Sequence, residues 1–489
     1  MNNLRRVAAL CLTMSILSGL ARAFDTGPHF DLTRAVLAEQ GFSDDGIKAV
    51  QVENWLTDYF STAPTILTPK RGDFTKLHFD NLYDAAEVRN YWAWIINNIK
   101  TEMQNAARND DPLAALTVLG IGLHAVQDFY AHSNWVETHP RYAGEPFRTE
   151  TYLRSNRLAP AALPLLTGKY PNDRKTGPGA ESLPEHAEMH GGYTSGLNHD
   201  SLVRPHWDEA YIFAYVASHE LIDAMANWAE TARPGFWRRL QETAVDTNGR
   251  KKLDYDISAL RNMSMWLNGN GSDGHWKGDR SGSSRFFSAF SSKWVLSDSS
   301  PFVRKMKDSD ISTAISTNLY ENLQPPPLPE IPGFRLHKRA IVVRTTLIKE
   351  IQDSGLIMSA IKKIGSPDFY SRLTIGKQEF WGRALQASRE TNDPWYEIFV
   401  VDADQRSVPI RLSVWDEDNP DSSKDAVIDI NAAAGKTTLD LIFNTINNEI
   451  SGDLAGKFDT PETAFSSSGA KPDKNHATVK AYVTQYLLR

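Results

Sequence analysis

The sequence predicts a multidomain protein in which an all-α domain precedes an all-β sandwich, and three observations support this fold class. From residue 24 to about 265, apolar residues recur at spacings of three and four, the period of amphipathic helices. The proline-rich segment NLQPPPLPEIPGF is typical of a stiff, extended linker. Beyond it the apolar period changes to two, which is typical of half-buried strands. We therefore expect an all-α domain at 24–325, a linker at 326–335 and a sandwich at 336–489.

The first 23 residues have the form of a secretory signal peptide. Arg5 and Arg6 precede an apolar run at 7–20, and small residues follow it up to Ala23. The run is too short to cross a bilayer as a helix. We expect cleavage after Ala23, a new amino terminus at Phe24, and a secreted or periplasmic protein.

The overall composition limits the classes of partner. The chain has 489 residues and a formal net charge of −7, so no global basic field favours nucleic acid or an anionic membrane. Its one cysteine, Cys11, lies in the predicted leader, so we expect a mature chain without disulfides. Any contact with a membrane is expected to be local, peripheral or bridged by a cation.

The individual elements follow from the two periods. Four segments carry the clearest helical period: HFDLTRAVLAEQGF, AAEVRNYWAWIINNIKTEMQNAA, DPLAALTVLGIGLHAVQDFYAH and EAYIFAYVASHELIDAMANWAE. Asp111 followed by Pro112 predicts an N-cap and a first turn for the third of them. Six later segments predict short strands: RAIVVRTTLI, FYSRLTI, WYEIFVV, VPIRLSVWD, AVIDI and ATVKAYVTQYL. Turn residues separate these strands, as in a β-sandwich.

The stretch GIGLHAVQDFYAHSNWVE places three ionisable residues in an apolar helix. Positions four apart share a helix face, so His124, Asp128 and His132 would form a polar line through the core. A single buried histidine is more often a hydrogen-bonded core residue, but each unpaired buried polar group costs about 1–3 kcal/mol. A metal would satisfy all three residues together. Two histidines at this spacing are a known zinc geometry, and the carboxylate between them can bridge two ions.

Further potential ligands occur along the same region. They are nitrogen and oxygen donors of the kinds that zinc accepts: Phe24 through its free α-amino and carbonyl groups, His29, Asp58, His78, His206 and Glu209. Each is a weak signal alone. Together with the polar line they supply enough donors for two or three zinc ions.

The order of these residues resembles the zinc-dependent phospholipase C superfamily, which also includes fungal single-strand-specific nucleases. Within it, LHAVQDFYAHSNWVE is similar to the signature of the Het-C heterokaryon-incompatibility family and its bacterial homologues. The resemblance covers roughly residues 24–230, and the fifteen-residue motif is its specific part. It implies an all-α domain with a trinuclear metal centre.

The resemblance implies one group of ligands for each ion: His78, His124 and Asp128 for the first, Phe24, His29 and the shared Asp128 for the second, and His132, His206 and Glu209 for the third. Asp58 would orient or deprotonate the water between the first two ions. In the phospholipases the interval from the aspartate to the next histidine is two residues longer, and the final carboxylate follows its histidine by four positions. The third group departs from this pattern, and His199 is an alternative to His206.

Three segments of the second part resemble, in order, a C2 domain: GSPDFYSRLTI, ETNDPWYEIFVV and VPIRLSVWDEDNPDSSKDAVIDI. Loops at one end of such a sandwich collect carboxylates, and crowded oxygen ligands favour calcium. The matching positions are Asp368, Asp416, Asp418 and Asp425. Calcium there would bridge an acidic protein to lipid phosphates. Clostridial phospholipases C of the same superfamily have the same domain order, which favours a phospholipid surface over nucleic acid.

These patterns predict a secreted, zinc-dependent phosphodiesterase, a phospholipase C that acts on membrane phospholipids and is docked by a calcium-binding C2-like domain. Its predicted catalytic residues are Asp58 and Asp128, because zinc lowers the pKa of bound water to about 7 and a carboxylate takes the proton. Two alternatives stay open. One is a nuclease or phosphatase with the same metal centre, although the chain lacks the basic, aromatic-interleaved tracts typical of single-strand binding. The other is a non-catalytic Het-C-type membrane-binding, self-recognition or toxin protein with structural metals.

Overall fold

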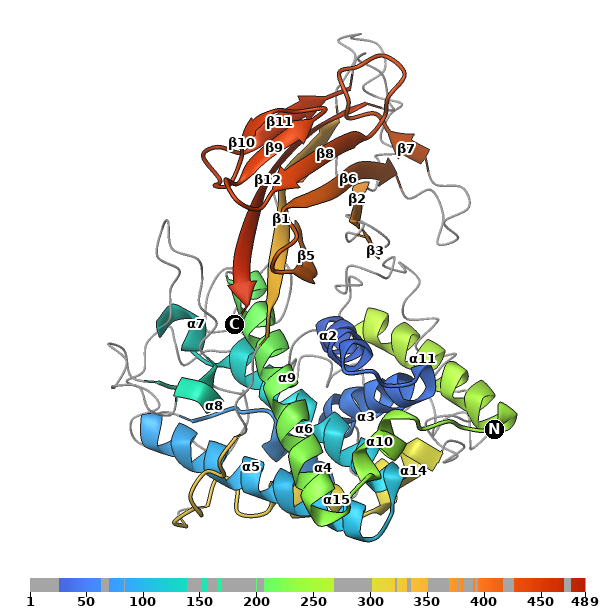
Figure 1. The fold of residues 1–489 in the computed structure, drawn as a ribbon, viewed down its shortest axis with the longest axis vertical. Coiled ribbons are helices and arrows are strands. Elements are labelled where there is room, and N and C mark those ends of the chain that lie inside the picture. Colours follow the sequence, from blue (N-terminus) through green and yellow to red (C-terminus); the bar gives the residue numbers. More distant parts are fainter. Residues whose placement is uncertain are drawn as a thin grey trace, which may run out of the picture.

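A computed structural model shows a helical part followed by an all-β part (Figure 1). It describes residues 26–62, 70–82, 84–138, 151–155, 165–168, 199, 206–267, 301–321, 323–331, 336–350, 369–375, 378–381, 390–391, 395–416, 426–469 and 476–488. The predicted signal peptide lies outside these residues.

Helices make up the first part of the chain. They are α2 (Thr26–Glu39), α3 (Asp44–Thr62), α4 (Arg71–Phe74), the 3₁₀ helix η1 (Thr75–Leu77), α5 (Ala85–Arg108), α6 (Pro112–His132), α7 (Trp135–Thr138), α8 (Tyr152–Ser155), α9 (Trp207–Ala232), α10 (Phe236–Gln241), α11 (Thr247–Leu267), α14 (Pro301–Asp308) and α15 (Ile311–Ser316). The four segments with the clearest helical period correspond to α2, α5, α6 and α9.

Strands make up the second part. They are β1 (Lys338–Glu350), β2 (Phe369–Ile375), β3 (Gln378–Trp381), β4 (Glu390–Thr391), β5 (Trp395–Asp402), β6 (Ser407–Asp416), β7 (Ala426–Ile428), β8 (Leu439–Asn444), β9 (Glu449–Gly452), β10 (Gly456–Lys457), β11 (Phe465–Ser468) and β12 (Ala477–Leu488). The last helix ends at Ser316 and the first strand begins at Lys338, on either side of the proline-rich segment.

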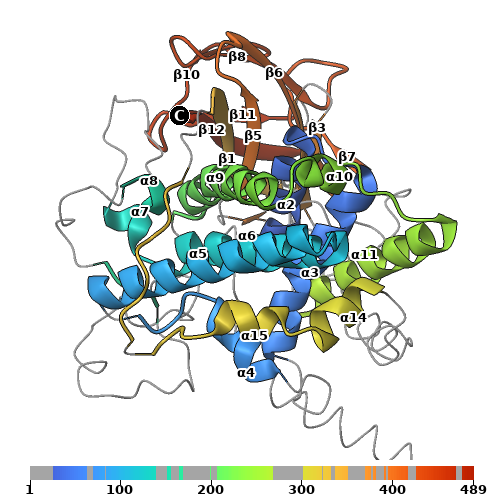
Figure 2. The ribbon, with the colours of Figure 1, turned by 60° about the horizontal axis from the view of Figure 1, so that its bottom comes forward.

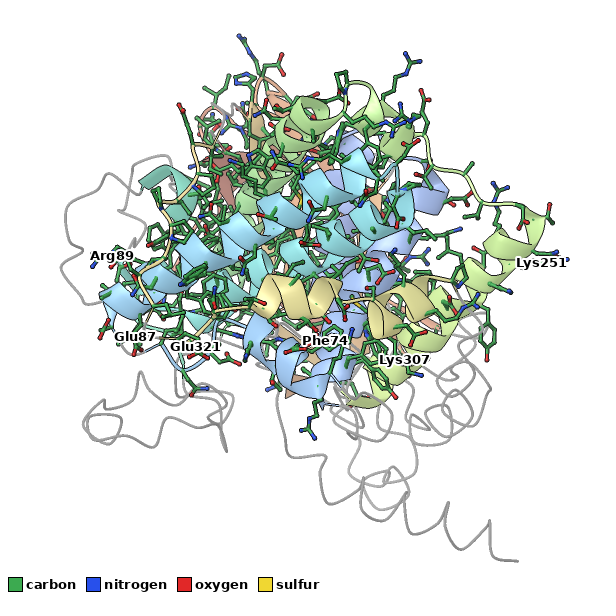
Figure 3. The ribbon with its side chains drawn as sticks, turned by 90° about the horizontal axis from the view of Figure 1, so that it is seen from below. Phe74, Glu87, Arg89, Lys251, Lys307 and Glu321 are labelled. Carbon is green, nitrogen blue, oxygen red and sulfur yellow. The ribbon has the colours of Figure 1, made fainter. Side chains whose placement is uncertain are left out.

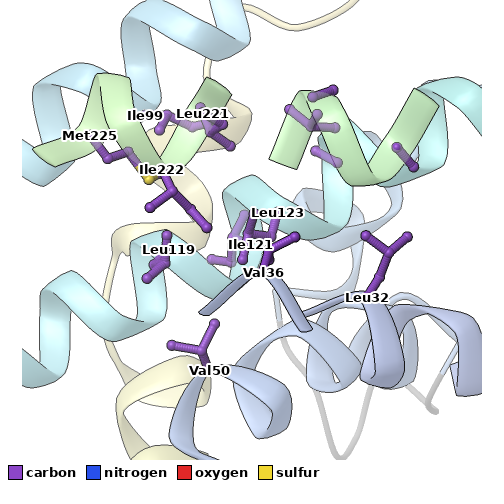
Figure 4. Packing of buried hydrophobic residues seen from close by; sticks show 14 of the residues in the cluster. Leu32, Val36, Val50, Ile99, Leu119, Ile121, Leu123, Leu221, Ile222 and Met225 are labelled. Carbon is purple, nitrogen blue, oxygen red and sulfur yellow. The ribbon is translucent and has the colours of Figure 1, made fainter. Parts of the chain in front are cut away.

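Helix α6 lies at the centre of the helical part. Asp111 caps it by accepting a hydrogen bond from the backbone N–H of Ala114, and Pro112 occupies its first turn, as the sequence predicts. Every residue from Ala114 to His132 is buried. Figure 4 shows Leu119, Ile121 and Leu123 of this helix among apolar side chains of its neighbours. Its length and composition would suit a membrane span, but 94% of the apolar window is buried, as in a core helix of a folded domain.

Two glycines let neighbouring helices approach α6 closely. A Cβ atom on Gly120 would lie 2.4 Å from the Cβ of Glu53 and 2.9 Å from the backbone nitrogen of Asn54, both in α3. A Cβ on Gly122 would lie 2.9 Å from the Cε of Met225 in α9. At Gly120 the backbone of α3 leaves no room for a side chain, whereas at Gly122 the closest atom is the flexible end of Met225. Both helices thereby bring polar side chains within reach of α6.

The end of the helical part that faces away from the strands carries both signs of charge. Figure 2 shows α14 and α15 on this side, whereas α9 lies next to the strands. Seen from below in Figure 3, the labelled charged side chains around it are Glu87, Arg89, Lys251, Lys307 and Glu321. The described side chains of this end thus mix acids and bases, which does not favour binding of a nucleic-acid backbone there.

The strands form two sheets. One has the order β11-β12-β1-β4, with β5 also paired to β1, and the other has the order β10-β9-β8-β6-β2-β3, with β7 paired to β6. Strand β1 runs antiparallel to β12, from Lys338 opposite Leu488 to Glu350 opposite Ala477. The apolar core between the sheets includes Phe399 of β5.

Strand β1 belongs to two cores at once. Ile341 and Val343 pack in the core of the sandwich, whereas the alternate residues Ala340 and Val342 belong to the core of the helical part. Successive side chains of a strand point to opposite faces, so β1 is buried on both of its faces. The sandwich is therefore packed directly against the helices, next to α9 (Figure 1).

Candidate metal centre

Four segments bring five predicted ligands together in the helical part. His29 lies in α2 and Asp58 in α3. His78 directly follows η1, and His124 and Asp128 lie in α6. The spacing of four places the last two on one face of α6. Four of these residues are buried, with relative solvent exposures of 1% for His29, 6% for His78 and 0% for His124 and Asp128. A buried cluster of this kind requires internal partners for every ring nitrogen and carboxylate oxygen.

Asp128 lies at the centre of the cluster, and its two oxygens face different histidines. Its Oδ1 lies 3.1 Å from Nε2 of His29. Its Oδ2 lies 2.9 Å from Nδ1 of His78 and 3.0 Å from Nε2 of His124. A carboxylate that bridges two cations presents one oxygen to each, and Asp128 has this arrangement.

The donor atoms have separations suited to a shared ion. Nε2 of His124 lies 3.1 Å from Nδ1 of His78, and Oδ1 of Asp58 lies 3.8 Å from each of these nitrogens. Ligands bound tetrahedrally at zinc distances lie about 3.3–3.4 Å from one another. The observed separations of 2.9–3.8 Å span this value. Asp58, His78, His124 and Asp128 therefore form a donor set of two nitrogens and two oxygens that fits a divalent metal such as zinc.

A second close group shares two of these residues. The donor atoms of His29, His124 and Asp128 all lie within 4.8 Å of one another, as do those of Asp58, His78 and His124. The two groups meet at His124, and Asp128 contacts both. The third donor predicted for the ion at His29 is Phe24, which lies outside the described residues.

Burial and neighbouring charges shift the pKa values of the ionisable groups in different directions. Burial lowers the pKa of His124 to about 3, so this ring is neutral at ordinary pH. Burial also acts against protonation of His29 and His78, but their hydrogen bonds and charge interactions with Asp128 outweigh it and raise the pKa of each ring. Burial raises the pKa of Asp58 to about 7, against the attraction of His78 and His29. Burial opposes the charge of Asp128 as well, yet the interactions with the surrounding histidines hold its pKa well below its usual range.

The cluster reaches solvent at one side. The side chain of Asp58 keeps 14% of its exposure and that of His78 keeps 7%, whereas His29, His124 and Asp128 keep at most 1%. Asp58 is therefore the least enclosed residue of the cluster, although its Oδ2 is buried.

The residues predicted to bind the third ion, His132, His206 and Glu209, make other contacts. Nδ1 of His132 lies 2.9 Å from the carbonyl oxygen of His78 and 3.0 Å from Oδ1 of Asp80. Nδ1 of His206 lies 2.8 Å from Oε2 of Glu209, and the His206 side chain is 51% exposed. Within the described ranges, the close groups of three donors do not include these three predicted ligands. The third ion site stays a prediction.

The alternative ligand His199 lies near His206. Their ring centroids are 6.1 Å apart, and Nε2 of His199 lies 3.1 Å from Oε1 of Glu137. Glu137 in α7 was not predicted as a site residue. It lies in the stretch 121–138 that also contains His124 and His132. That position in the sequence was the available signal that Glu137 lies near histidines.

Sequence reasoning also missed two amides beside the histidines. Nδ1 of His29 lies 2.7 Å from Oε1 of Gln127, and Nδ1 of His124 lies 3.3 Å from Oδ1 of Asn54. Asn54 precedes Asp58 by one helical turn. That spacing was the available signal, because positions four apart share a face of α3.

The predicted calcium site is described at one residue. Asp416 ends β6, where it lies opposite Phe369 of β2 and Ala426 of β7. The ends of these three strands therefore meet at the edge that was predicted to carry the carboxylates. The other predicted ligands, Asp368, Asp418 and Asp425, lie outside the described residues, so calcium binding stays a prediction.

A sequence model of the VWA7 N-terminal domain matches residues 67–145. This range contains His78, His124, Asp128 and His132, and it is less than half of the chain. The matched family is not the Het-C family, so the Het-C resemblance rests on the fifteen-residue motif. No curated protein matches the chain.

Three similar solved structures are distant. A C2 domain is 14% identical over 31% of this chain and 100% of its own, with a TM-score of 0.17. Alpha toxin from Clostridium absonum is 11% identical over 96% of this chain and 100% of its own, with a TM-score of 0.16. Human GIVD cytosolic phospholipase A2 is 12% identical over 32% of this chain, with a TM-score of 0.19, and the match spans only 17% of that enzyme. TM-scores this low do not establish a shared fold.

Proposed function

We propose that the protein is a secreted, metal-dependent hydrolase of phosphoesters, a zinc-dependent phospholipase C that acts on membrane phospholipids. The observation that carries the proposal is the position of Asp128, whose Oδ1 faces His29 and whose Oδ2 faces His78 and His124. A carboxylate placed in this way suits two neighbouring cations. Paired cations are typical of sites that hydrolyse phosphoesters.

The residues of the cluster would have two different roles, metal binding and activation of water. His29, His78, His124 and Asp128 would hold the cations. Zinc bound there supplies Lewis-acid polarisation of a phosphoryl oxygen and a lowered pKa for a neighbouring water. Asp58, at the solvent side of the cluster, would orient that water and take its proton.

Two features support a lipid substrate over nucleic acid. The net charge is −7, and the charged side chains at the exposed end of the helical part have both signs. The sandwich packs against the helical part through β1, so a membrane-docking edge near Asp416 would hold a fixed position relative to the cluster. Calcium at that edge, with Asp368, Asp418 and Asp425, would bind the phosphates of the membrane.

The test is hydrolysis by the chain without its leader, residues 24–489. Purified protein is incubated with phosphatidylcholine vesicles in calcium, before and after removal of its metals and after return of zinc. We expect release of phosphocholine that disappears on stripping and returns with zinc. Equal cleavage by the stripped protein would contradict the proposal.

The same experiment separates the alternatives when a matched pair of variants and further substrates are added. Asp128→Asn is expected to abolish hydrolysis, whereas Asp45→Asn, which removes a buried carboxylate paired with Arg250, is expected to retain it. Cleavage of single-stranded DNA or of p-nitrophenyl phosphate without cleavage of lipid would favour a nuclease or phosphatase. Tightly bound zinc without any hydrolysis would favour a non-catalytic protein with structural metals.

A further inference from the structure

We propose that Ser218, Gln127 and Asn54 form a hydrogen-bond relay that fixes the tautomers of His29 and His124, so that Nε2 of each ring presents its lone pair to Asp128. The three relay residues come from α9, α6 and α3. They are positioning residues, since they contact the predicted ligands and not the reacting atoms. The inference deepens the proposed function, on which its meaning for catalysis rests.

The relay begins at Ser218. Its hydroxyl donates to the carbonyl oxygen of Ala214, one turn earlier in α9, at 2.7 Å. A hydroxyl has one hydrogen, so towards Gln127 it can only accept. The Nε2 amide of Gln127 donates to it at 3.2 Å. This bond turns the carbonyl oxygen of Gln127 towards the histidines.

The carbonyl oxygen of Gln127 then fixes the first ring. Oε1 lies 2.7 Å from Nδ1 of His29, and an amide oxygen only accepts hydrogen bonds, so Nδ1 carries the hydrogen. A neutral imidazole has one N–H. In the singly protonated ring Nε2 of His29 would therefore present its lone pair to Oδ1 of Asp128, 3.1 Å away, whereas the doubly protonated ring donates to it.

The same oxygen orients Asn54, which fixes the second ring. Nδ2 of Asn54 donates to Oε1 of Gln127 at 3.2 Å and to Oγ1 of Thr33 at 3.1 Å. Its Oδ1 therefore faces Nδ1 of His124, 3.3 Å away, and that nitrogen carries the hydrogen. Nε2 of His124 presents its lone pair to Oδ2 of Asp128, 3.0 Å away.

With both rings singly protonated, two lone pairs would thus face one carboxylate across N···O distances of 3.0–3.1 Å, an arrangement that a cation between them stabilises. The opposite amide orientation would reverse both rings and give each an ordinary N–H bond to Asp128, which would block the metal positions. Asn54, Gln127 and Ser218 are 1%, 0% and 0% exposed, so water does not compete for their bonds. The relay would keep the rings ready for metal.

The direct test is the tautomer of each ring in the metal-free protein. Two-bond proton–nitrogen correlation spectra of histidine-labelled protein are recorded above the pH at which the same signals show that both rings have lost their second proton. We expect the hydrogen on Nδ1 of His29 and His124. A hydrogen on Nε2 of either ring would overturn the relay.

Zinc affinity, measured with zinc ions alone against a competing chelator, gives an independent readout. Gln127→Met removes the acceptor at His29 and is expected to weaken zinc binding about 10- to 100-fold. Gln127→Glu keeps an acceptor at that position and is expected to restore most of the affinity. If both variants bind zinc like the wild type, or lose affinity equally, the relay does not orient the rings.

A matched control separates positioning from loss of a buried hydroxyl. Ser218→Ala removes the start of the relay and is expected to weaken zinc binding. Thr57→Val removes another fully buried hydroxyl, which bonds the carbonyl oxygen of Glu53 within α3, and is expected to leave zinc affinity unchanged. A wild-type protein with both expected tautomers that hydrolyses no phosphoester would refute the proposed function and leave the relay intact. Active protein with reversed tautomers would refute the relay alone.

Discussion

Arg344 of β1 and Asp208 of α9 form a largely buried ion pair that joins the sandwich to the helical part. Nη2 of Arg344 also donates to the hydroxyl of Tyr486 at 2.8 Å, and that hydroxyl donates to Oδ2 of Asp208 at 3.1 Å. Asp208 stands between His206 and Glu209 in the sequence. The sandwich therefore holds the start of α9, with the predicted ligands His206 just before the helix and Glu209 in its first turn.

Replacement of this arginine is expected to destabilise the whole protein. Arg344→Met leaves the Asp208 carboxylate buried without its cation, and breaking a buried pair in this way costs about 3–5 kcal/mol. Lys338→Met is the control, because it removes the more exposed pair with Asp402, which is worth about 0–1 kcal/mol. The free energy of unfolding in urea measures both. Similar losses for the two variants would show that the junction is not held by the buried pair.

Gly120 is expected to be intolerant of alanine. The added Cβ would lie 2.4 Å from the Cβ of Glu53 and 2.9 Å from the backbone nitrogen of Asn54, so α3 would have to move away from α6. Overpacking of this kind costs about 1–3 kcal/mol. Gly72→Ala is the matched control, since its Cβ would meet nothing within 4 Å. It is expected to be neutral or slightly stabilising in urea unfolding, and an equal loss at both positions would contradict this packing.

Glu397 is expected to make stability depend on pH. Burial raises its pKa from 4.5 to about 8, although the hydroxyl of Ser371 donates to it at 2.5 Å. The folded state thus holds a proton that the unfolded state has lost. Stability should fall as pH rises from 4.5 through 8, by up to about 1.4 kcal/mol per pH unit.

Glu397→Gln has no proton to lose, so it is expected to remove this fall. Unfolding of both proteins at a series of pH values gives the comparison. Parallel curves for the two proteins between pH 4.5 and 8 would show that Glu397 does not hold its proton in the fold.

Asp128→Ala is expected to remove two zinc ions at once, because each carboxylate oxygen faces a separate set of rings. His29→Ala removes a donor from one side only and is expected to release one ion. Metal content is measured by plasma mass spectrometry after dialysis against a weak chelator, with Asp45→Ala as the control for loss of a buried carboxylate. An Asp128→Ala protein with the metal content of the wild type would exclude the bridging role.

Sequence periodicity predicted the fold class because the spacing of apolar residues, three and four in helices and two in strands, marks the buried face of each element. Helix α6 and its cap were readable from Asp111, Pro112 and the apolar run, and the strands from their alternation. The double burial of β1 was not predicted. A period of two reveals one covered face, whereas the burial of Ala340 and Val342 depends on a contact with helices far away in the sequence.

The proximity of His124 and Asp128 was predicted because local spacing encodes it. His124 and Asp128 share a face of α6 whatever the tertiary arrangement. His29, Asp58 and His78 were named from their residue type, and the resemblance supplied their grouping and roles. Asn54 and Gln127 were missed because their one local signal, the four-residue spacing of Asn54 from Asp58, does not separate a buried amide from other core polar residues. Their role appears only once α3 crosses α6 at Gly120.

Anomalous scattering from crystals of the zinc-loaded protein, recorded on both sides of the zinc absorption edge, tests the central claim most directly. Two peaks are predicted at Asp128, one between Oδ1 and His29 and the other between Oδ2 and the rings of His78 and His124. A map without a peak at this carboxylate, in which Asp128 only accepts hydrogen bonds from its neighbours, would contradict the claim that it bridges two cations.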